Sequence, residues 1–298
     1  MVRFVDSKKL EILMTAADLG SFTKASEVVG YTQSGLTHMM DALEKEVGFP
    51  LLQRSHNGIQ LTAQGRRLMP AIREFLRANA NLENEIQAIA EQKAEVIRIA
   101  AYASIAMHWM PEILYRFRRL CPETNVDLRM VDHALEPFEL LESGQADVIF
   151  ASRQNYSYCN WIPLYRETMY AILPKDYPLR EKEEFPLEEF ADHDFLMPYG
   201  NFDNDVNAAL KPVGIKLNAK ASKVDDETVI RMVGRGLGVS MMSELMVRGR
   251  TDDVQCVPVY PPAIRELGMG THIRRKETDS IRALKDCVLQ FIQELPQR

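Results

Sequence analysis

Residues 20–48, GSFTKASEVVGYTQSGLTHMMDALEKEVG, place two amphipathic helical patterns on either side of Gly30, and this arrangement strongly limits the folds open to the chain. A preceding helix is expected to stop at Gly20, since glycine readily ends a helix. A short second helix capped by Thr23 and closed by Gly30 follows, and a longer third helix begins after Thr32. A short helix, a tight turn and a longer helix make a helix-turn-helix unit.

The third helix keeps a polar stripe after its apolar residues are assigned to the core. Helical spacing predicts these inward-facing residues: Ala25, Val28 and Val29 in the second helix, and Leu36, Met39, Met40, Leu43 and Val47 in the third. The residues left over are Gln33, Ser34, Thr37, His38 and Asp41. In a helix-turn-helix this end enters the major groove, where glutamine can pair with adenine and hydroxyls can bond bases or phosphates. A solvated helix start is the alternative, but the helix-turn-helix spacing favours DNA reading.

A hairpin pattern follows in FPLLQRSHNGIQLT, where Asn57-Gly58 suits a tight turn between two apolar runs. We expect a wing from which Arg54 and His56 reach the DNA backbone, and an ordinary surface hairpin is the alternative. The residues predicted to contact DNA are Thr23, Thr32, Gln33, Ser34, Gly35, Thr37, His38, Arg54 and His56.

About a dozen positions in this segment resemble the amino-terminal signature of LysR-type transcriptional regulators, in order and spacing. They are Ser21-Phe22-Thr23, Ala25, Gln33, Leu43-Glu44, Gly48, Pro50-Leu51, Arg54, Leu61-Thr62 and Gly65. Ser26 and Leu52 stand where the family usually has Ala and Phe, and His38 and Asn57 where Arg is frequent. These departures are expected to alter the operator sequence and lower phosphate affinity. The resemblance implies binding to double-stranded operator DNA, with RNA polymerase as a further partner.

Charge is distributed unevenly along the chain. The net charge is -6, but residues 1–77 contain ten Lys/Arg and eight Asp/Glu, whereas residues 78–298 contain 26 and 34. Only the amino-terminal part therefore offers a mildly positive face to phosphate.

A long helix is predicted from Thr62, as its cap, to about Gln92. Its apolar positions alternate steps of four and three, as in a coiled coil: Leu68, Ile72, Phe75, Asn79, Leu82, Ile86 and Ile89. Such a seam needs a partner helix. Asn79 either fixes the register of the pair or lies at a wet edge of the seam. The resemblance implies the same pairing, because linker helices of this family form dimers that commonly pair into tetramers.

Strand and helix patterns alternate from about Glu95 and again after Trp161, which predicts two α/β lobes built on parallel sheets with helical crossovers. The layout, with DDETVIRMVGRGLGVSMMS, resembles the LysR effector-binding domain, which is similar to type II periplasmic binding proteins. The predicted fold class is therefore α+β multidomain. Its parts are a winged helix-turn-helix domain at 1–62, a linker and dimerisation helix at 63–93, and an effector-binding domain at 94–298. By resemblance the chain crosses between lobes near 154–165 and 260–268, so that one lobe takes about 94–160 with 269–298 and the other about 161–268.

A small effector is expected between these lobes, since open α/β sheets bind ligands beyond the carboxyl ends of their strands. Ser104 and Ile105 follow the first strand at a helix start, where free N–H groups favour an anion. A small carboxylate with an apolar body is the favoured class. Loop packing is the alternative for each residue alone, but as a set they occupy cleft-lining positions of the proteins that the chain resembles. The predicted effector residues are Ser104, Ile105, Ala151, Arg153, Pro198, Tyr199 and Val224.

Other classes of function find little support. The glycine-rich run at 234–238 follows a helix and precedes a strand, the reverse of a dinucleotide loop, and no catalytic or zinc-ligand spacing is present, so no enzyme, cofactor or metal site is expected. No export signal or membrane-spanning run is visible, which predicts a cytoplasmic protein without a membrane partner and disfavours a solute-binding protein with no DNA role. The four cysteines are scattered, so structural thiols are expected, and redox control through Cys159 is the alternative to a ligand.

Overall fold

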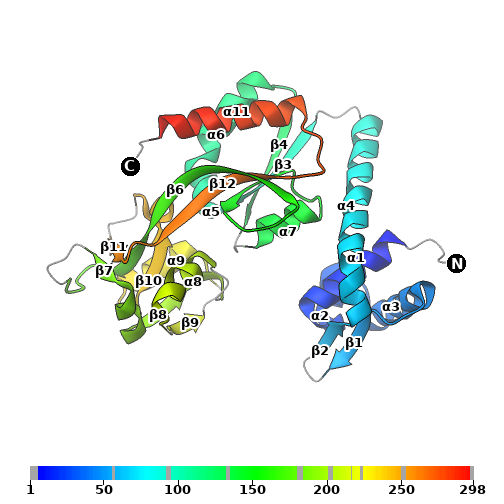
Figure 1. Cartoon of the computed structure of the whole chain (residues 1–298), viewed down its shortest axis with the longest axis horizontal. Helices are drawn as coiled ribbons and strands as arrows, with labels where there is room; N and C mark the ends of the chain where they lie inside the picture. The colour runs from blue at the N-terminus through cyan, green and yellow to red at the C-terminus, as the bar shows by residue number, and fades with distance from the viewer. Residues whose placement is uncertain are drawn as a thin grey trace. The chain divides into compact units, whose positions relative to one another are not determined.

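The computed structural model of the chain (Figure 1) describes residues 6–55, 58–91, 95–131, 135–179, 184–200, 204–215, 217–221, 224–249 and 253–295. The chain forms two compact units, of which the first contains the amino-terminal 93 residues and the second nearly all of the rest. Each unit has its own hydrophobic core. No helix among the described residues is both long enough and apolar enough to span a membrane.

The first unit is a winged helix-turn-helix followed by a long helix. Its elements are α1 (Ser7–Leu19), α2 (Phe22–Val29), α3 (Gln33–Val47), β1 (Leu52–Ser55), β2 (Gly58–Leu61) and α4 (Ala63–Glu91). Its core is made by the apolar faces of the helices, and Ile12, Leu13 and Leu36 are fully buried in it. The hydroxyl of Thr62 accepts the N–H of Gly65 at 3.0 Å, which confirms the predicted cap of α4.

Two details of α2 differ from the sequence prediction. Ser21, not Thr23, caps the helix, since its hydroxyl accepts the N–H of Lys24 at 3.3 Å and Thr23 lies inside the first turn. Serine and threonine are nearly equivalent caps, so the sequence alone does not separate the two positions. Val28 is 68% exposed, because α2 packs between α1 and α3 through a narrow face in which Ala25 is the buried residue.

The predicted wing is present as the antiparallel pair β1–β2, with Leu52 opposite Leu61. Gly58 has a φ of 104°, and a side chain there would collide with the carbonyl oxygen of Gly20. The N–H of Ile59 donates to that same oxygen at 2.8 Å, so the wing is tied to the end of α1. The predicted DNA-contacting residue His56, its neighbour Asn57 and the side chain of Arg54 lie outside the described residues.

The second unit begins with a parallel sheet covered by helices. Its elements are β3 (Val96–Tyr102), α5 (Ala103–His108), α6 (Met110–Leu120), β4 (Asn125–Val131), α7 (Glu136–Glu142), β5 (Val148–Ser152) and the carboxyl-terminal α11 (Asp279–Glu294). Strands β4, β3 and β5 lie side by side in that order and parallel. Trp109, Phe117, Phe138 and Phe150 fill the core between sheet and helices, and α11 packs on α6.

Two long strands, β6 (Cys159–Pro174) and β12 (Ile264–His272), run antiparallel from this lobe into the next (Figure 1). β12 also pairs antiparallel with β5, so the first lobe does not have the purely parallel sheet that the sequence predicts. The other half of β6, from Met169 to Pro174, pairs with strands of the second lobe. The sequence prediction missed β12, since Gly268 and Gly270 weaken its strand pattern.

The second lobe is built around the far half of β6. Its elements are β7 (Phe185–Pro186), η1 (Leu187–Asp192), β8 (Asp194–Met197), η2 (Pro198–Gly200), α8 (Asn204–Leu210), η3 (Lys211–Val213), β9 (Asn218–Ala221), α9 (Asp226–Gly234), β10 (Ser240–Ser243), α10 (Glu244–Val247) and β11 (Val254–Tyr260). Phe185, Phe190 and Phe195 pack in its core, with ring centroids 4.7 Å apart in a tilted pair and 5.2 Å apart in an edge-to-face pair. The second unit is thus the two-lobed α/β domain that the sequence predicts.

Candidate functional site

The amino-terminal end of α3 carries the predicted polar stripe. Thr32 caps the helix, and its hydroxyl accepts the N–H of Gly35 at 3.1 Å. Gln33, Ser34 and His38 are exposed, and the hydroxyl of Thr37 donates to the carbonyl oxygen of Gln33 at 3.0 Å. The apolar face of the same helix is buried in the core, so these polar side chains have no packing role there.

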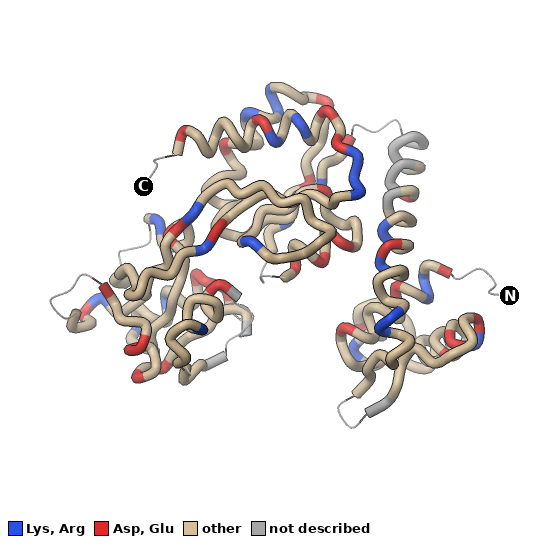
Figure 2. Tube along the Cα trace, in the orientation of Figure 1, with Lys and Arg blue, Asp and Glu red and all other residues tan. Residues whose placement is uncertain are grey.

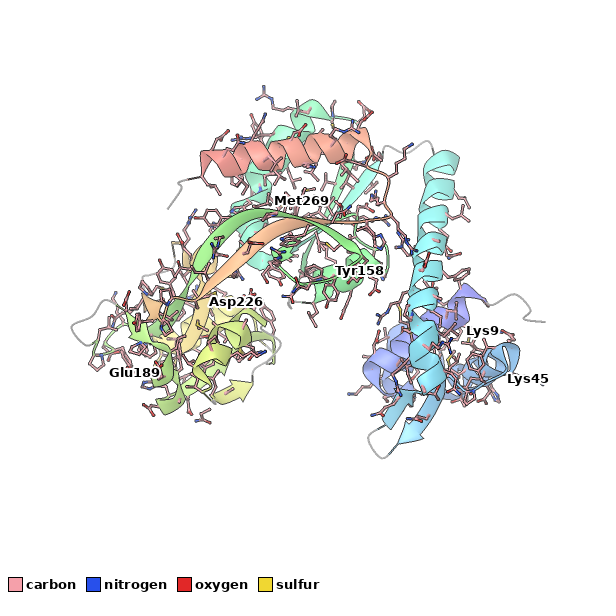
Figure 3. All side chains as sticks on the ribbon, viewed as in Figure 1. Lys9, Lys45, Tyr158, Glu189, Asp226 and Met269 are labelled. Carbon is pink, nitrogen blue, oxygen red and sulfur yellow. The ribbon has the colours of Figure 1, made fainter. Side chains whose placement is uncertain are left out.

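Glu44 fixes the wing to this helix. Its Oε1 accepts the N–H of Leu51 at 2.6 Å and that of Leu52 at 2.9 Å, where the chain turns from α3 into β1. Two residues further along α3, Glu46 pairs with Lys9 of α1 at 2.5 Å. Lys45, labelled in Figure 3, is exposed at the far end of α3. Glu44 therefore ties the start of the wing to α3, the helix that carries the polar stripe.

The linker helix α4 divides its apolar residues between two surfaces. Ile72 is buried in the helix-turn-helix core together with Met69 and Leu76, and Leu68 packs at the edge of that core. Further along, Phe75, Leu82 and Ile86 are 45%, 59% and 56% exposed. The seven-residue seam that the spacing predicts is therefore covered at its start by its own domain. The exposed part consists of these three side chains among the described residues.

Asn79 and Ile89 are the two other predicted seam residues of α4. The side-chain amide of Asn79 donates to Oε1 of Glu83 at 2.9 Å, so it has a partner within its own helix. The side chain of Ile89 lies outside the described residues, although α4 continues past it.

In the second unit, a buried arginine lies where β12 joins the two lobes. Arg265, with its side chain 12% exposed, donates Nε to Glu167 Oε1 at 2.6 Å and Nη1 to Asp205 Oδ2 at 3.0 Å. Its Nη2 donates to Ser104 Oγ at 3.1 Å and to Ser243 Oγ at 2.7 Å. Five segments far apart in the sequence thus meet at one guanidinium.

The network extends into both lobes. Ser152 at the end of β5 donates to Asp205 Oδ1 at 2.7 Å, and the hydroxyl of Tyr102 lies 3.2 Å from that of Ser152. Oε2 of Glu167 accepts the N–H of Leu245 at 2.7 Å. Figure 2 shows charged positions interspersed along the paired strands β6 and β12.

Arg265 keeps its charge in this position. Burial alone lowers the pKa of its guanidinium, but the carboxylates of Glu167 and Asp205 raise the pKa by more, so that it lies above the ordinary value for arginine. Arg265 is thus shared by two carboxylates, those of Glu167 and Asp205.

A cleft of about 660 Å³ opens beside this network, a volume in the range of small-molecule sites. Its polar wall includes Ser152, Asp205 and Arg265. Its apolar wall consists of Met169, Leu187, Ala208, Ala209, Pro212 and the residues at 261–264. The cleft is therefore lined by both charged and aliphatic side chains.

The predicted effector residues divide into three groups. Ser104 takes part in the network around Arg265, and Arg153 lines the cleft, 57% exposed and paired with Glu266 at 3.2 Å. Ile105 and Ala151 are fully buried in the first-lobe core. The helix α5 has only six residues. The positive charge beside Ser104 is therefore that of the Arg265 guanidinium, whose Nη2 donates to Ser104 Oγ, and not that of the helix start.

The remaining predicted residues lie close to one another in the second lobe but do not line this cleft. The N–H of Tyr199 donates to the carbonyl oxygen of Val224 at 3.1 Å, and its hydroxyl donates to Asp226 Oδ2 at 3.3 Å. Tyr199 has a φ of 52°, and Pro198 before it is buried.

The sequence interpretation missed Arg265, Asp205, Glu167, Ser152 and Ser243. One signal was available: Glu167 and Arg265 are charged residues within apolar strand patterns, and they face each other across β6 and β12. Residues 260–268 were predicted to be a crossing between lobes and not part of the strand β12. Without that strand, the alternation of side chains that predicts which face carries Arg265 could not be used.

The redox alternative is tested by the state of Cys159. Burial raises the pKa of its thiol to about 11, and a backbone hydrogen bond with Thr271 offsets only part of this effect. Since the thiolate is the reactive form, we expect alkylation of Cys159 in the folded protein at pH 8 to be about 100-fold slower than for a thiol of ordinary pKa.

Mass spectrometry of iodoacetamide labelling against pH measures this rate. The rate should climb with pH until about 11, while the same cysteine in urea-unfolded protein serves as the control. A folded-state midpoint below pH 9 would contradict the burial of this thiol and restore the redox alternative.

Comparison with known proteins identifies both parts of the chain. Residues 7–66 match the family described as bacterial regulatory helix-turn-helix protein, lysR family. Residues 90–293 match the LysR substrate binding domain. The two matches agree with the winged helix-turn-helix and the two-lobed domain.

Individual proteins show the same relationship over most of their length. YybE of Bacillus subtilis, an HTH-type transcriptional regulator, is 23% identical over 266 residues, or 88% of this chain and 91% of the relative. The HTH-type transcriptional regulator MetR of Salmonella typhimurium is 26% identical over 247 residues, or 82% and 76%.

A solved structure of full-length CbnR complexed with its target DNA has the same fold. It superposes with a TM-score of 0.54 at 19% identity, covering 97% of this chain and 100% of CbnR. Since one family match spans more than half of the chain and another spans its helix-turn-helix, the chain belongs to the LysR family of helix-turn-helix transcriptional regulators.

Proposed function

We propose that the protein reads operator DNA with Gln33, Ser34, Thr37 and His38 and that a small acid bound beside Arg265 controls this reading. The observation that carries the DNA-binding part is the exposed polar stripe at the start of α3, on a helix whose other face is buried. The DNA-binding part corresponds to residues 1–62, the linker to 63–93 and the effector-binding part to 94–298. The relatives are regulators, so we assign no enzymatic activity to the chain.

The working form is a dimer, or a pair of dimers, joined through α4. Phe75, Leu82 and Ile86 present apolar surface that a second α4 would cover. Two reading helices then contact half-sites about 34 Å apart, or a multiple of that distance, on one DNA face. The protein acts on DNA in the cytoplasm, and RNA polymerase is its partner in transcription.

The effector is a small carboxylate with an apolar body. The hydroxyl of Ser152 and the guanidinium of Arg265 both line the cleft, and together they form a donor set suited to a carboxylate. The other walls are aliphatic and fit an apolar body. Binding alters regulation by favouring one arrangement of the lobes over another.

Substitution of the reading helix tests the DNA-binding assignment. We expect Gln33→Ala and Thr37→Ala each to weaken operator binding by about 1 to 3 kcal/mol, or about 5- to 150-fold, since each removes a base contact. Fluorescence anisotropy with DNA from upstream of the protein's own gene measures the loss.

Lys45→Ala is the matched control, because Lys45 is exposed at the opposite end of the same helix. It should leave sequence preference unchanged. If Gln33→Ala and Thr37→Ala also leave affinity and preference at wild-type values, α3 is not the reading helix.

A further inference from the structure

We propose that Asp205 is a built-in substitute for the effector's carboxylate: its side chain fills the acid-binding end of the cleft, and an acidic effector binds by displacing it from Arg265 and Ser152. This inference rests on the proposed function and specifies how the same site works. It assigns Asp205 the role of an internal ligand that competes with the effector.

The contacts of Asp205 are those expected of a bound carboxylate. Its Oδ2 accepts from Arg265 Nη1 at 3.0 Å, and its Oδ1 accepts from the hydroxyl of Ser152 at 2.7 Å. A guanidinium and a hydroxyl, each holding one oxygen, orient a free carboxylate in the same way. Asp205 also lines the cleft, so its position is continuous with the space that would take the effector's body.

Of the two carboxylates paired with Arg265, that of Asp205 is the one that an effector carboxylate would replace. Arg265 is already paired with Glu167, its cross-strand partner, at 2.6 Å, and the Glu167 side chain is fully buried. That pair is neutral and belongs to the framework of β6 and β12. Asp205 is the second carboxylate on the same guanidinium, and an effector carboxylate placed beside both would add repulsion in a poorly solvated site. An acid and Asp205 therefore exclude each other at Arg265.

The exchange also couples the ligand to the lobes. Asp205 lies in the first turn of α8, in the second lobe, whereas Ser152 ends β5 of the first lobe. Their hydrogen bond joins the two lobes, and the same helix supplies Ala208 and Ala209 to the cleft wall. Displacing Asp205 exchanges a lobe-to-lobe contact for a contact through the ligand. The position of α8 relative to the first lobe would therefore differ between the acid-bound and the acid-free protein.

Chemical rescue tests the inference in the full-length protein. Asp205→Ala removes the internal carboxylate and leaves its donors in place, so acetate should bind there. We expect the Tm of Asp205→Ala to lie below that of the wild type. Sodium acetate at ten times its Kd should then raise the variant's Tm by about 3 to 6 °C over sodium chloride of equal ionic strength. The wild type should show no such difference, because Asp205 already occupies the donors.

Two further variants define the outcome. Glu266→Ala removes a carboxylate at the mouth of the cleft, where its partner Arg153 is solvated, and acetate should not stabilise it. Ser152→Ala combined with Asp205→Ala removes one donor and should reduce the rescue. Absence of rescue in Asp205→Ala, or an equal acetate effect on all variants and the wild type, overturns the inference.

Operator binding by the wild type separates this result from the proposed function. Specific DNA binding without acetate rescue defeats the role of Asp205 alone. A wild-type protein that binds no DNA specifically defeats the proposed regulator, whatever acetate does.

Discussion

Replacing Arg265 by methionine is expected to destabilise the second unit by about 3 to 5 kcal/mol. The substitution removes the cation and leaves the carboxylates of Glu167 and Asp205 in a buried site without their partner. Urea unfolding followed by circular dichroism measures the free energy of unfolding, provided that the transition of this unit is separated from that of the first.

Two control variants show how much of the stability loss depends on burial of the ion pair and how much on the unpaired charges. Arg153→Met breaks an exposed pair with Glu266 and should change stability by about 0 to 1 kcal/mol. Adding Glu167→Gln to Arg265→Met should recover part of the loss, since it removes one of the two unpaired charges. A loss below 1 kcal/mol for Arg265→Met would show that the network is not the buried junction described above.

The double substitution Leu82→Glu and Ile86→Glu is expected to convert the protein to a monomer. It places four like charges across a seam that two copies of α4 would otherwise bury. Because each half-site is then bound separately, operator affinity should fall by about 10²- to 10⁴-fold through loss of bivalency. Sedimentation and operator titration on the same samples measure both effects.

Leu237→Glu provides the comparison, because Leu237 is an equally exposed leucine in the second unit. This variant should sediment and bind DNA as the wild type does. If the Leu82→Glu, Ile86→Glu protein remains a dimer with full affinity, the copies associate through another surface.

The helix-turn-helix is predictable because its determinants are local. Caps, glycine stops and helical periodicity lie within a few residues of the structure that they specify. The errors at Thr23 and Val28 arise where local signals are nearly equal. Two cap residues two positions apart, Ser21 and Thr23, compete, and a two-turn helix needs only one narrow buried face.

The linker shows a different limit. The position of Ile72 fits both the coiled-coil seam and the helix-turn-helix core of its own domain. Periodicity alone does not decide whether such a residue packs against a second α4 or within its own domain. Burial in the folded unit separates Ile72 from Leu82 and Ile86.

The cleft is the least predictable part. Ser104 was found because it follows a strand, but Asp205 and Arg265 meet across 60 residues of chain. Their contact depends on the pairing of β12 with both β5 and β6, which no local pattern encodes. The contact of Asp205 with Arg265 could therefore be identified only in the folded structure.

The most direct test of the account is sequencing of the DNA fragments recovered with the full-length wild type and with Gln33→Ala. Wild-type fragments are expected to share two inverted half-sites whose centres lie about 10 base pairs, or a multiple of that, apart. Fragments recovered with Gln33→Ala should show a relaxed preference at one position of each half-site. Fragments without a shared motif, or an identical motif with both proteins, would contradict the claim that α3 reads the operator.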